Sequence, residues 1–128
     1  MRTIYSVALA AAGSFALGAA AMHGLHAQTK PLAYVIAEIE VSNADAYAKE
    51  FIPSAGKAIE DAGGKFIVRG GKTKSFMGAA PENRIAVFHF DNLEKAEAWW
   101  DSPGRKNSQP IGDKYAKFRI YAAEGVTP

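Results

Sequence analysis

The sequence predicts an α+β domain with the element order βαββαβ. Two stretches, at 33–41 and 115–124, alternate with a period of two, and a run at 84–90 is rich in β-branched and aromatic residues. Two stretches with apolar residues at helical spacing lie between them. Two helices on one face of a four-stranded antiparallel sheet account for this order, which is the ferredoxin-like plan.

The first strand is predicted over 33–41, where Val35, Ala37 and Ile39 alternate with Tyr34 and Glu38. A period of two places successive side chains on opposite faces of a sheet. The three aliphatic side chains therefore face the helices, and Tyr34 and Glu38 face the other side.

The first helix is predicted to begin after Asn43, because this residue type caps helix N-termini. Apolar residues then recur at helical spacing from Tyr47 to Ala62. Pro53 lies inside this stretch and is expected to kink the helix or split it in two. Gly63-Gly64 provides the C-terminal end.

Two more strands are predicted, at 65–69 and 84–90. The connection between them has some strand character at 75–77. With regular alternation, Arg69 lies on the face away from the helices together with His89. Arg84 enters its strand after a turn and is interpreted as a loop-bracing or surface residue.

The second helix is predicted to begin at Asp91, which forms a variant of the capping box with Glu94. Its inner side carries Leu93, Ala96 and one of the paired tryptophans at 99–100, since adjacent helical positions diverge by about 100°.

The end of the second helix is predicted at Ser102-Pro103-Gly104. The polar stretch at 105–113 is expected to be irregular. In the last strand, at 115–124, Arg119 and Tyr121 face away from the helices.

The first 27 residues have the pattern of a secretory signal peptide. Arg2 gives a basic start, residues 4–22 are uncharged, and Leu25-His26-Ala27 offers a small-residue cleavage site. An uncleaved membrane anchor is the alternative, because the run approaches the about 20 residues of a spanning helix. With cleavage, residues 28–128 form one domain, with its core at about 33–126, in the periplasm or secreted and away from the membrane.

The charge balance and the lack of cysteine exclude several function classes. The chain has 15 basic and 13 acidic side chains, too even a balance for nucleic-acid binding or a polybasic membrane surface. No cysteine is present, which excludes thiol catalysis. His89 is the one histidine after the leader, so neither a metal site nor a cofactor is expected.

The sheet face away from the helices is too apolar to remain exposed in a monomer. A second copy covers it most simply, so an isologous homodimer with sheet against sheet is predicted. The apolar side chains on this face are Tyr34, Ile36, Ile67, Ile85, Val87 and Tyr121.

The same face gathers the candidate site residues. A few convergent polar groups above an apolar floor are typical of a small-molecule site. His89 is the candidate catalytic residue, and the candidate ligand-binding residues are Arg69, Glu38, Tyr34, Tyr121 and Arg119.

His89 and Arg69 each fit two roles. His89 fits a general base whose tautomer Glu38 holds, or a histidine hydrogen-bonded within the dimer interface. Arg69 fits a clamp for a carboxylate or enolate oxygen, or an ion pair between subunits with Glu38 or Glu40.

Three motifs are similar to those of a known family. The strings GGKFIVRGG at 63–71, PENR at 81–84 and AWWDSP at 98–103 resemble the domain-of-unknown-function 1330 family, over about 33–126. The resemblance implies a homodimeric member of the dimeric α/β-barrel superfamily, with a cleft on the inner sheet face. The family itself is uncharacterised, and His89 replaces its common glutamate.

The predicted function is that of an exported homodimeric barrel domain that binds a small organic molecule in its cleft. One alternative is a cofactor-independent isomerase or monooxygenase, a kind of enzyme frequent in the superfamily, in which His89 moves a proton and Arg69 stabilises an oxyanion. The other alternative is a structural dimer without a ligand.

Overall fold

A computed structural model describes residues 30–127, and the predicted signal peptide at 1–27 lies outside this range. The strands are β1 (Ala33–Val41), β2 (Lys65–Arg69), β3 (Arg84–Phe90) and β4 (Ala116–Glu124). They form one antiparallel sheet in the order β2-β3-β1-β4, which confirms the predicted fold class. None of the helices within residues 30–127 has the length and apolar character needed to span a membrane.

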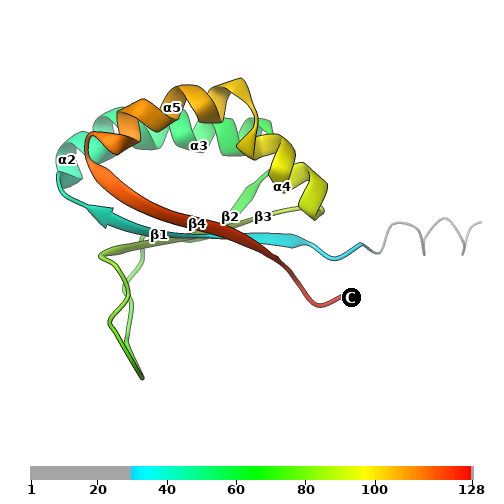
Figure 1. The fold of residues 1–128 in the computed structure, drawn as a ribbon, viewed down its shortest axis with the longest axis horizontal. Helices are drawn as coiled ribbons and strands as arrows, with labels where there is room; N and C mark the ends of the chain where they lie inside the picture. The colour runs from blue at the N-terminus through cyan, green and yellow to red at the C-terminus, as the bar shows by residue number, and fades with distance from the viewer. Residues whose placement is uncertain (1–29, 128) are drawn as a thin grey trace, which may run out of the picture. The chain divides into compact units, whose positions relative to one another are not determined.

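The helices lie on one face of the sheet, and the connection between β2 and β3 projects from the other face (Figure 1). We call this second face the open face. The helical elements are α2 (Ala44–Ala46), the π-helical turn η1 (Tyr47–Phe51), α3 (Ile52–Asp61), α4 (Leu93–Trp100) and α5 (Pro103–Asp113).

The first helical segment follows the sequence prediction closely. The Asn43 side chain caps it by accepting a hydrogen bond from the backbone N–H of Ala46 at 3.1 Å. Pro53 occupies the first turn of α3, where its missing N–H costs least. The helical conformation continues from η1 through Ile52 into α3, so Pro53 does not split the helix, and the irregularity here is the π-helical turn that precedes it.

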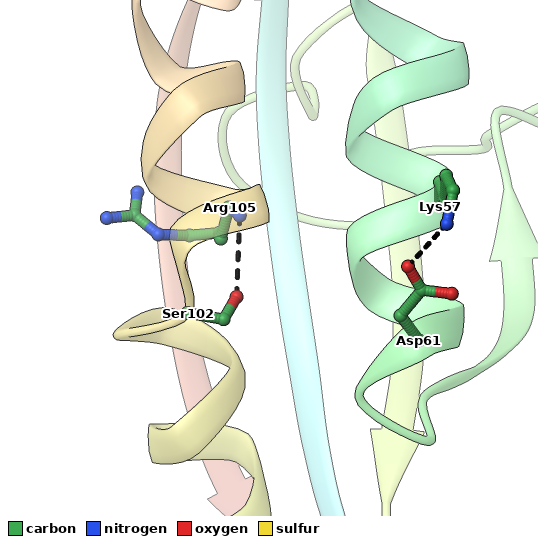
Figure 2. Close-up of polar contacts among 4 residues, drawn as sticks. All are labelled: Lys57, Asp61, Ser102 and Arg105. Carbon is green, nitrogen blue, oxygen red and sulfur yellow. Dashed lines mark hydrogen bonds and ion pairs between the residues drawn. The ribbon is translucent and has the colours of Figure 1, made fainter.

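The prediction that residues 105–113 are irregular is wrong, because they belong to α5. Ser102 begins this helix, since its Oγ accepts a hydrogen bond from the backbone N–H of Arg105 at 3.4 Å (Figure 2). The cap of α4 also differs from the prediction, because Asn92 and not Asp91 accepts the hydrogen bond from the N–H of Lys95 at 2.9 Å.

The core lies between the helices and the sheet. Val35, Ala37 and Ile39 of β1 are buried there, as the alternation predicts. Of the paired tryptophans, Trp99 is 5% exposed and contacts the sheet, whereas Trp100 is 42% exposed. Trp99 is therefore the tryptophan on the inner side predicted for the second helix.

The connection between β2 and β3 has no strand at residues 75–77, so the strand character expected there is absent. Phe76 and Met77 are among its most exposed side chains. At its end the Asn83 amide accepts a hydrogen bond from the N–H of Val41 at 2.9 Å and donates one to the carbonyl oxygen of Val41 at 3.0 Å. These two bonds anchor the start of β3 to the end of β1.

A β-bulge interrupts the pairing of β2 with β3. Phe66 lies opposite Phe88 and Val68 lies opposite Val87, so Ile67 between them has no partner. Such an extra residue reverses the alternation of every side chain that follows it in the strand.

Deletion of Ile67 is expected to lower the free energy of unfolding by about 1 kcal/mol or less, because the remaining pairs keep their register. Deletion of Ile36 from central β1 is expected to prevent folding, since it moves half of that strand to the wrong face. Urea denaturation of both variants is the measurement. A deletion of Ile67 as damaging as that of Ile36 would contradict the bulge.

Candidate functional site

Five of the six predicted site residues lie on the open face. Tyr34 lies opposite His89, with their ring centres 5.8 Å apart. Glu38 accepts a hydrogen bond from Nη1 of Arg119 at 3.0 Å. The guanidinium carbon of Arg119 also lies 5.2 Å from the ring centre of Tyr121. The charged groups predicted to bind a ligand are therefore partly paired with each other.

His89 and Glu38 do not form the predicted general-base pair. His89 lies opposite Tyr34, and Glu38 is four residues further along β1, so about 13 Å of strand separates the two positions. A carboxylate at that distance does not hold the tautomer of the imidazole. Within one copy of the chain, this pairing hypothesis is wrong.

The prediction that Arg69 shares the open face is also wrong. Because of the bulge at Ile67, Arg69 lies opposite Ala86, which is buried beneath the helices. Its guanidinium carbon lies 4.3 Å from the ring centre of Phe66. Its Nη2 lies 3.2 Å from where a Cβ on Gly56 of α3 would be, so the absence of a side chain there makes room for the guanidinium.

A cavity lies on this helix face, between the sheet and the helices α3 and α5. The volume that the centres of water-sized molecules can occupy in it is about 80 Å³, which is room for several waters. Its walls are mostly apolar, with Ile39, Ile52, Ile59, Phe66, Phe118 and Ile120 among them. The polar side chains that line it are Arg69, Arg84, Arg105, Ser108 and Gln109.

Arg84 lines this cavity and has an unused hydrogen-bond donor. Its Nε is buried and has no partner among the described residues. Its guanidinium carbon lies 5.5 Å from the ring centre of Tyr47. Burial raises the pKa of the Tyr47 hydroxyl, and the charge of Arg84 and its hydrogen bond to Tyr47 oppose this rise. An unpaired buried donor costs about 1–3 kcal/mol.

Arg69 and Arg84 are neighbours on the sheet. Arg69 lies opposite Ala86, and Arg84 precedes Ala86 by two residues, so the two arginines form a diagonal pair about 7–8 Å apart on one face. No carboxylate lines the cavity in the described part of the chain. The pair therefore presents positive charge without an acidic partner within the cavity.

Arg105 differs from these two arginines because hydrogen bonds to neighbouring residues hold its guanidinium in place. Its Nε donates to the carbonyl oxygen of Trp100 at 2.5 Å, and its Nη1 donates to Oε1 of Gln109 at 2.7 Å. Its guanidinium carbon lies 3.8 Å from the ring centre of Trp100. We therefore assign Arg105 to the junction of α4 and α5 rather than to the binding of a ligand.

A second hollow, of about 460 Å³, lies beside α4 and β4. The charged residues that line it are Glu97 and Asp101, so the charge of its lining is opposite in sign to that of the cavity. Trp99 lines both hollows, and its buried indole N–H has no acceptor among the described residues. Residues 30–127 contain no cluster of three or more histidine, aspartate or glutamate side chains suited to a metal ion.

Sequence reasoning missed Arg84, although the signal was present. Arg84 has the same parity as Ala86, Phe88 and Phe90, so alternation alone places it on the helix face. Its interpretation as a loop-bracing or surface residue is therefore wrong, because it is half-buried and lines the cavity.

The fold and the cavity define a class of protein: an α+β domain with a basic cavity between one helical layer and an antiparallel sheet. The chain belongs to the family described as Domain of unknown function (DUF1330), whose model matches residues 32–126. This match confirms the resemblance seen in the sequence motifs. No protein of curated function matches the sequence.

Solved structures share the fold. The RPA0582 protein of unknown function from Rhodopseudomonas palustris is 12% identical with a TM-score of 0.63, covering 77% of this chain and 85% of that one. A conserved protein of unknown function from Bacteroides thetaiotaomicron, described as a possible oxidoreductase, is 12% identical with a TM-score of 0.52, covering 75% and 99%. These similarities establish the fold alone.

Proposed function

We propose that this protein is an exported binding module that takes a small organic molecule into the cavity between its helices and its sheet. The observation that carries the proposal is a cavity with mostly apolar walls whose lining includes the arginines Arg69 and Arg84 and, among the described residues, no carboxylate. Small-molecule sites combine these two features, because the walls supply affinity and the few polar groups set the orientation.

We propose that the open face serves assembly into a homodimer. In the single chain, Ile67, Val68 and Tyr121 remain 55%, 40% and 44% exposed on this face. An apolar sheet face of this kind is typically covered, and an isologous contact covers it on both copies at once. His89 then takes the second of its two roles, as an interface histidine beside Tyr34.

The enzyme alternative loses its geometric support. It requires His89 and Arg69 to act on the same molecule, but His89 lies on the open face and Arg69 lies on the helix face. The sheet separates the two groups within one copy. A binding module is therefore the function that this geometry supports best.

Filling the cavity tests the proposal. Ala55 of α3 lines the cavity, so Ala55→Phe is expected to abolish the binding of small probes, namely benzoate, benzamide, isovalerate and isovaleramide. Ala98 is exposed on α4 and outside the cavity, so Ala98→Phe is the matched control and is expected to leave binding unchanged.

The measurement is a titration followed by chemical-shift changes of backbone amides. In the wild type, the shifted amides are expected to lie around the cavity. Failure of all four probes to bind the wild-type protein, or equal binding by Ala55→Phe, would contradict the proposed function.

A further inference from the structure

The two hollows of this domain differ in the sign of their charge. The cavity between helices and sheet is lined by basic side chains and by no acidic one, whereas the hollow beside α4 has Glu97 and Asp101 and no basic side chain. A cavity with such one-sided charge favours a ligand of opposite charge.

Two local features of the backbone bring the charges of the cavity together. The bulge at Ile67 turns Arg69 to the helix face. Gly70 has a φ of +72°, and the guanidinium carbon of Arg84 lies 2.8 Å from the place that a Cβ on Gly70 would occupy. A side chain at position 70 would therefore displace Arg84. Both features serve the placement of the arginine pair.

The two guanidinium groups keep donors available. No salt bridge within the described residues joins Arg69 or Arg84 to a carboxylate. The ring of Phe66 supports Arg69 from one side, and Nε of Arg84 has no acceptor. Guanidinium groups match the planar geometry of a carboxylate, to which they donate two parallel hydrogen bonds.

We infer that the ligand is an organic anion, whose carboxylate or similar oxyanion lies between Arg84 and Arg69. The inference rests on the proposed function and adds the chemical class of the ligand. The cavity walls include Phe66, Ile52 and Ile120. A ligand that contacts them needs an apolar group attached to its anionic group. Inorganic phosphate would leave these walls without contact, so an apolar carboxylate fits better than a bare ion.

The test compares carboxylates with neutral amides of the same shape. At pH 7 we expect benzoate to bind the wild type at least about tenfold more tightly than benzamide, and isovalerate to exceed isovaleramide similarly. Arg84→Gln and Arg69→Gln are each expected to remove this preference, as measured by titration calorimetry. Arg69 is exposed, so its variant keeps the test valid even where Arg84→Gln impairs folding.

Lys57→Gln is the matched control, because it removes the same charge from the outer surface of α3. Lys57 forms an ion pair with Asp61 at 2.7 Å, on the outer side of the helix (Figure 2). The preference for carboxylates is expected to survive in this variant.

Four outcomes would overturn the inference. Equal binding of amides and carboxylates would support the cavity as a binding site but would contradict an anionic ligand. A preference for carboxylates that persists in both arginine variants would arise from the overall charge of the protein and not from the arginine pair. A preference that Lys57→Gln also removes would have the same origin. Failure of every probe to bind the wild type would remove the cavity as a site, and the anion with it.

Discussion

Replacement of Trp99 by alanine is expected to lower the free energy of unfolding by about 3–5 kcal/mol. The Trp99 ring is 5% exposed and lies 5.1 Å from the ring centre of Phe88 and 5.7 Å from that of Phe90. Removal of this ring leaves a void beneath α4 that the rigid sheet cannot fill. Since small domains are stable by about 5–15 kcal/mol, the loss is a large share of the total.

Trp100→Ala provides the matched control on the neighbouring residue. Trp100 is 42% exposed, and the guanidinium carbon of Arg105 lies 3.8 Å from its ring centre. The Trp100 ring also lies 5.7 Å from the ring centre of Trp99. We expect a loss of about 1–2 kcal/mol, since both contacts are partly exposed to water. Urea denaturation of both variants gives the comparison, and equal losses would refute the different roles of the two tryptophans.

Replacement of Ile36 by arginine is expected to convert the proposed homodimer into a folded monomer. Ile36 lies in the middle of the open face, opposite Val87 on one side and Tyr121 on the other. In an isologous interface the substitution occurs twice, and the removal of both guanidinium charges from water opposes association. The dissociation constant of the dimer is expected to rise at least about 100-fold.

Sedimentation velocity and native mass spectrometry measure this change. Ala98→Arg, on the exposed side of α4, is the control and is expected to leave the dimer intact. A wild-type protein that is already monomeric, or an Ile36→Arg variant that remains dimeric, would contradict assembly through the open face.

The regular strands were predictable because alternation is a local property. In β1 the helix-facing residues Val35, Ala37 and Ile39 are buried as expected, and β4 places Arg119 and Tyr121 on the open face. The irregularity next to Pro53 was equally local, since proline lacks the N–H that a helix interior needs.

The helix α5 was not predictable from its own residues. It contains Pro110 and little apolar surface, so its intrinsic preference for a helix is weak. The packing of α5 against the first helical segment compensates for this weak preference. A Cβ on Gly112 would lie 2.8 Å from Cδ1 of Phe51, and one on Gly104 would lie 3.2 Å from Cβ of Ala58. These approaches exist only in the folded domain.

The sequence by itself determined the order of the elements, the faces of the regular strands and the family of the chain. Only the tertiary structure placed the residues of the candidate site, because a bulge is a mismatch between two paired strands and is absent from the alternation of either strand alone. The unpaired Ile67 reversed the face of Arg69 and brought it next to Arg84. A cavity between two layers, likewise, exists only once the layers have packed.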